Sequence, residues 1–254
     1  MKKILLLIIL TALSLSNYAS ISESEADRVI ERFKTIFSSP FLEATFKALV
    51  FVKDFRKFEK RAYIEEKSLF FRVTIERGLI DAREMTSDSF ALILCHELGH
   101  AMGGAPYKKS KTMDQFGETI TTVSWSSAEG QADYYATSSC MKKYLEEEDN
   151  GDFLQNADIP DSLIDRCSQN TQDPLGQAIC IRSALAIIPA LTIINPNKDS
   201  ISFSTPDQNL SASTLLGYPS LQCRMDTYLH GATGQEKPRC WYLPGHDGNA
   251  SWKF

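Results

Sequence analysis

The stretch Cys95–His100, which reads Cys-His-Glu-Leu-Gly-His, decides the expected fold and contains the pattern His-Glu-x-x-His. Successive helical residues are rotated by about 100°, so on a helix His96 and His100 lie on one face, one turn apart. Two imidazoles placed in this way can bind one tetrahedral zinc ion. Glu97 lies beside that face, where it can accept a proton from a water activated by the metal. The stretch therefore predicts a zinc site on a helix.

A third ligand is expected from Glu129–Asp133, which reads Glu-Gly-Gln-Ala-Asp. On a helix Glu129 and Asp133 share a face, so Glu129 can bind the metal while Asp133 orients a ligand imidazole from behind. An alternative is that Ser126-x-x-Glu129 forms a capping box, in which Glu129 only starts a helix. The two histidines upstream need a partner, which favours the ligand.

Around these motifs, the hydrophobic pattern predicts an α+β fold, mostly helical with a small sheet. Alternating apolar residues predict a strand over 69–75, closed by Gly78. The active-site helix is expected to begin at Ser87 or Asp88 and to run to Gly103-Gly104, and a polar loop should follow it. Further helices are expected over residues 24–38 (ended by Pro40), 41–60, 127–147, 175–190 and 221–231, with a loop over 195–215.

The N-terminal residues predict the compartment. Residues 1–19 combine Lys2 and Lys3 with an apolar core and a small residue, Ala19, so they are expected to be a signal peptide cleaved near Ala19. No later stretch is expected to span a membrane. Residues 20–254 are then expected to form one domain, periplasmic or secreted, whose C-terminal region contains disulfides. A net charge of −5 argues against nucleic-acid binding.

The six cysteines form an even set, and disulfides are the default in an oxidising compartment. Cys167–Cys180 and Cys223–Cys240 are plausible local pairs. Cys140 lies eleven residues after Glu129, which is about 16 Å along a straight helix, whereas Cys95 adjoins His96. Because both Glu129 and Cys95 are expected near the metal, a Cys95–Cys140 bridge is disfavoured, and Cys95 is expected to be a buried free thiol.

Four segments together resemble the HtpX- and BepA-type gluzincin zinc peptidases. The pattern Phe71–Ile80 is similar to the edge strand and Gly-Leu turn of that family, and His96–His100 to its active-site helix. Glu129–Asp133 is similar to its Glu-x-x-Ala-Asp helix, and Tyr218–Met225 to its His-Pro-x-x-x-x-Arg-Ile segment. The similarity covers roughly residues 69–140 and 217–230.

The resemblance implies a zincin-like (minigluzincin) domain and a zinc-dependent endopeptidase with one Zn²⁺, in which Asp133 holds His96. It implies that Arg224 orients site residues or the substrate. It also implies that residues 70–76 offer a strand edge along which a polypeptide substrate binds. Tyr218 stands where the family has His, and its hydroxyl is the candidate donor to the developing oxyanion. His230 and His246 are possible substitutes for that His.

Two other functions remain open. The same metal chemistry could hydrolyse another amide, such as a crosslink in cell-wall material. The chain could also be a zinc-binding chaperone or binding module that has lost peptidase activity, which the Tyr at position 218 favours. Retention of Glu97 argues against the latter, since a pure binding module needs no general base.

Overall fold

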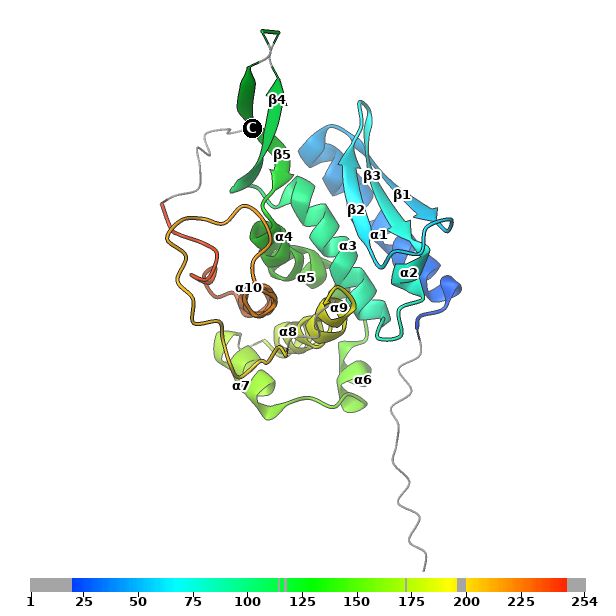
Figure 1. The fold of residues 1–254 in the computed structure, drawn as a ribbon. Helices are drawn as coiled ribbons and strands as arrows, with labels where there is room; N and C mark the ends of the chain where they lie inside the picture. Colours follow the sequence, from blue (N-terminus) through cyan, green and yellow to red (C-terminus); the bar gives the residue numbers. More distant parts are fainter. Residues whose placement is uncertain (1–19, 114, 117, 172, 196–199, 246–254) are drawn as a thin grey trace, which may run out of the picture.

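The computed structural model describes residues 20–245, apart from 114, 117, 172 and 196–199. Helix α3 (Ser87–Met102) lies at the centre of the protein. A small sheet and α1 (Glu23–Thr45) lie on one side of α3, and the C-terminal helices lie on the other (Figure 1). The predicted class, α+β and mostly helical with a small sheet, is confirmed.

The N-terminal helix α1 is longer than predicted. Ser22 and Glu25 form a capping box at its start, and the helix continues through Pro40 instead of ending there. It ends at Phe46, which adopts a left-handed conformation. The helix predicted over 41–60 is wrong, because Ala48–Asp54 forms strand β1. Its alternating Val and Phe side chains suit a half-buried strand better than a helix.

The first sheet corrects the expected substrate edge. Strand β3 (Phe70–Glu76) confirms the strand predicted over 69–75, but it is the central strand. It pairs in parallel with β1 on one side and antiparallel with β2 (Ala62–Glu66) on the other. Residues 70–76 therefore have no free edge for a substrate. The edge strand beside α3 is β2, and no other strand in the described part of the chain pairs with its outer edge.

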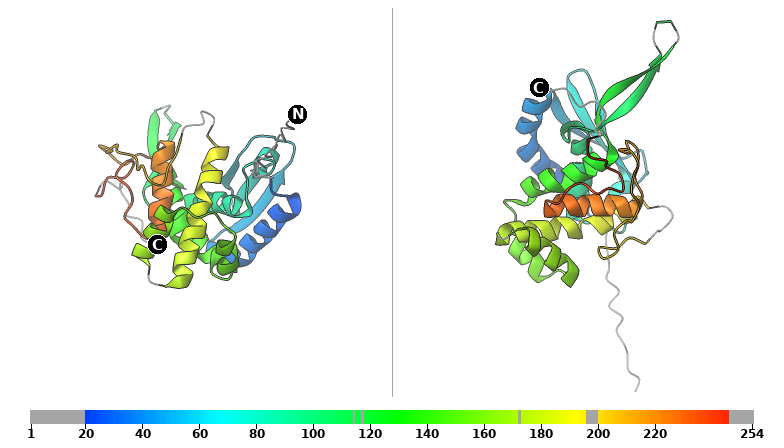
Figure 2. Two further views of the ribbon diagram at one scale, coloured as in Figure 1. Left: turned by 90° about the horizontal axis from the view of Figure 1, so that it is seen from below. Right: turned by 90° about the vertical axis from the view of Figure 1, so that its left-hand side faces the viewer.

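The helix predicted to contain the His-Glu-x-x-His motif forms as α3, although its cap is Thr86, in a capping box with Ser89. The polar segment that follows is not a loop. It forms a hairpin of β4 (Tyr107–Met113) and β5 (Thr119–Ser127), which projects from the body of the protein (Figures 1 and 2). Most of its side chains are exposed on both faces, so it lacks the one-sided apolar pattern that reveals a strand in a sequence.

The helix predicted over 127–147 is confirmed as one continuous helical stretch over 129–145, which has three parts. They are α4 (Glu129–Tyr135), a π-helical turn η1 (Ala136–Cys140) and α5 (Met141–Leu145). Helices α3 and α4 pack closely, since a Cβ at Gly99 would lie 2.7 Å from the carbonyl oxygen of Ala132. Only glycine permits this approach.

The close packing of α3 against α4 and η1 also explains an error about the cysteines. Cys95 forms a disulfide with Cys140, with the Cα atoms 5.5 Å apart, so Cys95 is not a free thiol. Cys95 and His96 point about 100° apart around α3, so Cys95 faces η1 while His96 faces Glu129 and Asp133 of α4. Helix α3 contacts η1 as well as α4, so the chain that leaves Ala132 stays against α3 until it reaches Cys140. The distance along α4 and η1 therefore does not separate the two cysteines.

The C-terminal half is helical and is held by two further disulfides. It contains α6 (Asn150–Gln155), α7 (Asp161–Asn170), α8 (Pro174–Leu185), α9 (Ile187–Ile193) and α10 (Leu221–Thr233). The predicted pairs Cys167–Cys180 and Cys223–Cys240 are both present. The described residues of the segment 195–215 form no helix or strand, as predicted.

One apolar stretch was missed as a candidate span. Pro174–Ile193, which comprises α8 and α9, is long and apolar enough to cross a membrane by length and composition. However, 61% of its most apolar window is buried inside the protein, and core helices of soluble proteins meet the same criteria. Arg182 of α8 forms a buried ion pair with Asp88 in the first turn of α3, with N–O distances of 2.7 and 2.9 Å. The stretch is thus part of the core packing.

Candidate metal centre

The three predicted ligands meet in one place. His96 and His100 come from α3, and Glu129 is the first residue of α4. Glu129 Oε2 lies 3.3 Å from His96 Nε2 and 3.7 Å from His100 Nε2, and all three residues are buried. The alternative capping role of Glu129 is wrong, since the N-cap of α4 is Ala128 and Ser126 caps no helix.

The hydrogen bonds on the far side of each imidazole determine which nitrogen faces the centre. His96 Nδ1 lies 2.7 Å from Asp133 Oδ1, and His100 Nδ1 lies 2.9 Å from the carbonyl oxygen of Ser127. Both partners only accept, so each Nδ1 donates a proton, and each Nε2 presents a lone pair when its ring is neutral. Glu129 Oε2 is buried without a hydrogen-bond partner. Three lone pairs that face one another require a proton or a cation between them, so this group could hold a metal ion.

The electrostatics of the metal-free centre agree with this geometry. Burial alone would lower the pKa of His96, but Asp133 and Glu129 outweigh it and raise that pKa to about 9. Burial lowers the pKa of His100 to about 3, so its ring stays neutral. Burial would raise the pKa of Glu129, but His96, His100 and Lys108 together lower it. In the metal-free protein His96 therefore carries a second ring proton, on Nε2, and a metal ion would replace this proton.

Behind His96 lies a buried pair from α4 and α10. Arg224 donates to both oxygens of Asp133 at 2.7 Å, and Asp133 accepts from His96 at the same distance. Arg224 thus reaches His96 through Asp133. Tyr228, one turn further along α10, places its hydroxyl 3.4 Å from His96 Nδ1 and 3.5 Å from Arg224. Sequence reasoning missed Tyr228, although its spacing of four residues from Arg224 was a usable signal.

Glu97 lies beside the three candidate ligands but makes a separate contact. It is buried, and the backbone N–H of Ile64 in β2 lies near its carboxylate and favours the charged form. Burial raises the pKa of Glu97 to about 7, and the nearby Glu129 adds to the rise. A carboxylate with this pKa can both accept and release a proton near neutral pH.

Lys108, at the base of the hairpin, is a second residue that sequence reasoning missed. Its Nζ lies 2.5 Å from Glu129 Oε1, the oxygen turned away from the histidines. This contact leaves Oε2 directed at the imidazoles. The polar segment 107–127 gave no sequence signal that would assign Lys108 to the site. On the other side of α4, the buried ring of Trp241 packs against Gly130, where a Cβ would lie 2.4 Å from the ring.

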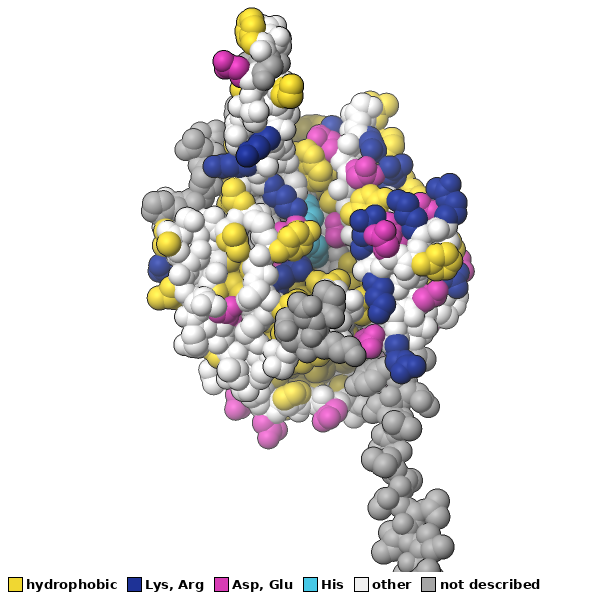
Figure 3. Space-filling view, viewed as in Figure 1, with side chains coloured by type: hydrophobic (Ala, Val, Ile, Leu, Met, Phe, Trp, Pro, Cys, Tyr) yellow, Lys and Arg dark blue, Asp and Glu magenta, His cyan; other side chains and the backbone are white. Residues whose placement is uncertain are grey.

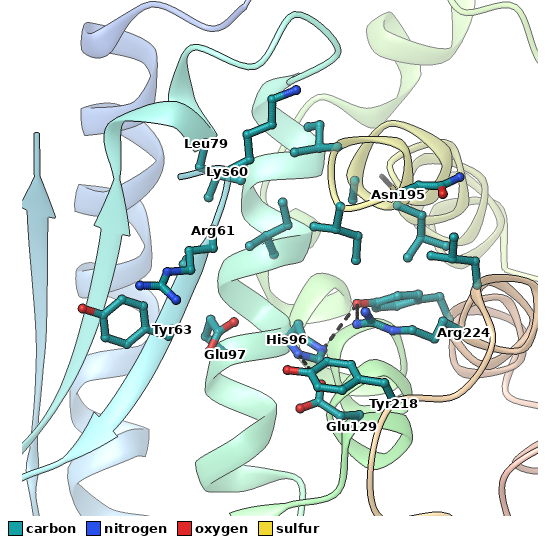
Figure 4. Close-up of a pocket in the computed structure, with 18 of the residues that line it drawn as sticks. Lys60, Arg61, Tyr63, Leu79, His96, Glu97, Glu129, Asn195, Tyr218 and Arg224 are labelled. Atoms are coloured by element: carbon teal, nitrogen blue, oxygen red, sulfur yellow. Dashed lines mark hydrogen bonds and ion pairs between the residues drawn. The ribbon is translucent and has the colours of Figure 1, made fainter. Parts of the chain in front are cut away.

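Tyr218 lies at the mouth of the site, with its hydroxyl near Glu129 (Figure 4). Its ring is 74% exposed and lies 5.9 Å from the Arg224 guanidinium. Partial burial of the hydroxyl and the charge of Glu129 raise the pKa of Tyr218. His230 is not a substitute, because it bonds to the carbonyl oxygen of Glu236 and does not line the cleft. His246 lies outside the described residues.

The ligands lie on the floor of an open cleft of about 1380 Å³. Histidine side chains are visible at the bottom of a hollow between the sheet and the C-terminal half (Figure 3). The face of α3 with His96 and Glu97 forms the floor, β2 one wall and α9 the other (Figure 4). The centre is therefore accessible to a large ligand.

A second group of possible ligands, Asp207 with Cys223 and Cys240, is not a metal site here, because its two sulfur atoms are joined in a disulfide. Comparison of the chain with protein-family models, with curated proteins and with solved structures found no match.

Proposed function

We propose that this protein is a zinc-dependent endopeptidase of the gluzincin type. The observation that carries the proposal is the position of Glu97. Its carboxylate shares the floor of an open cleft with three convergent lone pairs, and burial raises its pKa to about 7. A structural metal site is closed and has no use for such a residue, whereas a hydrolytic site needs both an accessible metal and a base.

His96, His100 and Glu129 would hold the metal, for which two nitrogens and one carboxylate suit zinc. A bound zinc ion supplies Lewis acidity to a water and to the substrate carbonyl. Glu97 accepts the proton of the attacking water and passes it to the leaving amine. Asp133 keeps the His96 lone pair directed at the centre, and Arg224 keeps Asp133 in place. Tyr218 is the candidate donor to the oxygen that gains charge in the reaction.

The free edge of β2 offers the substrate a backbone partner. The Ile64 N–H of β2 lies near the Glu97 carboxylate, which supports binding of a substrate along the outer edge of this strand. An extended peptide paired with that edge lies across the cleft floor, and its backbone bonds require no particular sequence. The resemblance of four segments to the HtpX- and BepA-type peptidases supports the same assignment.

The compartment belongs to the proposal as well. All six cysteines are paired, which is typical of proteins that mature in an oxidising environment. The segment assigned as a signal peptide lies outside the described residues. We propose a periplasmic or secreted enzyme.

The test is a pair of matched substitutions in the cleft, Glu97→Gln and Glu84→Gln. Glu84 also lines the cleft but makes no contact with the three ligands. We expect zinc-loaded protein to cleave casein, Glu97→Gln to lose this activity while still binding zinc, and Glu84→Gln to retain it. Full activity of Glu97→Gln would refute the assigned base. Hydrolysis of peptidoglycan but not casein would instead indicate an amidase.

A further inference from the structure

The first turn of α4, which carries the candidate ligand Glu129, has no side-chain cap. Its N-cap is Ala128, which cannot accept a hydrogen bond through its side chain. A first turn of this kind leaves backbone N–H groups without partners and is less stable than a capped one. Lys108 and Pro106 contact this turn on the side of the hairpin. The position of its backbone therefore depends on what packs against the other side.

The ring of Trp241 fills that other side. Trp241 is fully buried, and a Cβ at Gly130 would lie 2.4, 2.5 and 2.8 Å from three carbon atoms of its indole. The ring therefore rests directly on the α4 backbone, one residue after Glu129. Among the described residues, the main apolar core does not include Trp241, and Trp241 Nε1 is buried without a hydrogen-bond partner. Neither core packing nor a hydrogen bond accounts for this ring, whereas its contact with α4 does.

Trp241 reaches α4 on a segment that has no regular structure. Residues 235–245 form neither helix nor strand. Backbone hydrogen bonds of 2.8 Å join this segment to residues 211–215, which are equally irregular. The covalent attachment is the disulfide between Cys240, the residue before Trp241, and Cys223 in the first turn of α10. Helix α10 in turn packs against α4, so this bridge fixes the segment to the body of the protein beside the ring.

Of the three disulfides, this one is the most open to a reductant. Five of the six cysteines are at least 98% buried, whereas Cys240 is only partly buried. Reduction by thiol–disulfide exchange requires a thiolate to reach one of the two sulfur atoms, so exposed bridges react before buried ones. The bridge that holds Trp241 in place is thus also the one that is easiest to break.

We infer that Trp241 is a positioning residue for the metal ligand Glu129, and that the Cys223–Cys240 disulfide is a redox-sensitive link that holds it there. A dithiol reduces this link: its two thiols give up two electrons and two protons and become a disulfide, while Cys223 and Cys240 become thiols. Trp241 then leaves Gly130, the first turn of α4 loosens, and the affinity for the metal falls. The inference rests on the proposed function only in needing its metal site, and does not need the hydrolysis.

The first experiment measures the zinc affinity of the full-length protein by competition with a chromophoric chelator. Trp241→Ala should weaken zinc binding about 10- to 100-fold, as the loss of a residue that orients a ligand does. Trp241→Phe, which keeps an aromatic ring, should retain most of the affinity. In the Co²⁺-substituted protein, Trp241→Ala should also change the visible absorption of the metal, because Glu129 is no longer held in place.

Leu163→Ala is the matched control. Leu163 is as deeply buried as Trp241, but it lies on α7 and does not line the cleft. Its truncation should lower the stability of the protein and leave the zinc affinity and the Co²⁺ spectrum unchanged. A purely structural role of Trp241 would give the same result as this control.

The second experiment breaks the link. The protein is treated with limiting dithiothreitol, its thiols are blocked with iodoacetamide, and the reagents are removed before zinc is added, because a dithiol binds zinc itself. Mass spectrometry should find Cys223 and Cys240 modified before the other cysteines, and this material should bind zinc about 10- to 100-fold more weakly. Cys223→Ser/Cys240→Ser should show the same loss without a reductant, whereas Cys167→Ser/Cys180→Ser should not.

Unchanged zinc affinity in folded Trp241→Ala or in Cys223→Ser/Cys240→Ser would overturn the inference, and so would earlier reduction of either other disulfide. If Trp241→Ala does not fold, the cysteine variant decides. Failure of the proposed function gives a different pattern. Zinc binding that these variants weaken, in a protein that cleaves no peptide, would refute the peptidase and leave the inference standing. An intact protein that binds no zinc would overturn both.

Discussion

The disulfide beside the candidate metal centre should stabilise the protein more than the one between α7 and α8. Cys95–Cys140 closes a loop of 45 residues, whereas Cys167–Cys180 closes a loop of 13. In the chain-entropy model, the cost of closing a loop in the unfolded chain grows with the logarithm of its length. The two bridges then contribute about 4 and about 3 kcal/mol respectively. Their difference, about 1 kcal/mol, is more reliable than either value alone.

The assay is urea unfolding of two variants, Cys95→Ala/Cys140→Ala and Cys167→Ala/Cys180→Ala. All four side chains are at least 98% buried, so the cavities left by the lost sulfur atoms are similar and largely cancel in the comparison. A chelator is present throughout, because metal bound by histidine and carboxylate side chains of the unfolded chain would otherwise change the measured stability. We expect the first variant to have the lower free energy of unfolding, at equal m-value.

The reasoning would be refuted if the two variants were equally stable, or if the variant lacking the shorter loop were the weaker. A lower m-value in only one variant would indicate that its unfolded state, and not the loop length, changed. Urea unfolding of the intact protein provides the reference.

Further predictions concern the metal and the charges behind it. Zinc at about 100 times its dissociation constant should stabilise the protein by about 2.7 kcal/mol, and a chelator should reverse this; a melting temperature that ignores zinc would contradict the site. Asp133→Asn should weaken zinc binding about 10- to 100-fold in competition with a chromophoric chelator, and unchanged affinity would show that Asp133 does not orient His96. Because the metal-free His96 has a pKa of about 9, zinc must displace its proton below that pH. The affinity for zinc should therefore rise about tenfold per pH unit below pH 9 and then level off, and a constant affinity from pH 7 to 8 would contradict this. Arg224→Met, which leaves a buried carboxylate partly unpaired, should lower the free energy of unfolding by about 3–5 kcal/mol in urea, whereas Arg77→Met at an exposed pair with Asp81 should cost under about 1 kcal/mol.

The residues of the candidate centre could be predicted because a helix of fixed pitch converts sequence spacing directly into position. His96 and His100 are four residues apart, and both rings reach Glu129. Glu129 and Asp133 are also four residues apart, and both carboxylates reach His96. Only the contact between the two helices depends on tertiary packing. It was expected because two histidines need a third protein ligand to bind zinc.

Other features depend on packing between distant segments, which spacing does not encode. Lys108 reaches Glu129 only because a hairpin replaces the expected loop, and Tyr228 reaches His96 only because α10 lies against α4. Strand β3 confirms the strand predicted over 69–75, yet its place at the centre of the sheet depends on β1, for whose residues the sequence pattern predicts a helix. The pairing of Cys95 with Cys140 likewise depends on how α3 lies along its neighbour.

The position of the β4–β5 hairpin in the chain has a practical consequence. The hairpin separates His100 from Glu129 along the sequence, but its two strands leave and rejoin the body of the protein side by side. The distance between these two residues is therefore set at the base of the hairpin and does not depend on the hairpin's length. The entropy of lengthening such a turn grows only slowly with added residues. A fluorophore or an affinity tag grafted at its tip would thus report on the protein while leaving the distance between the anchoring residues as it is.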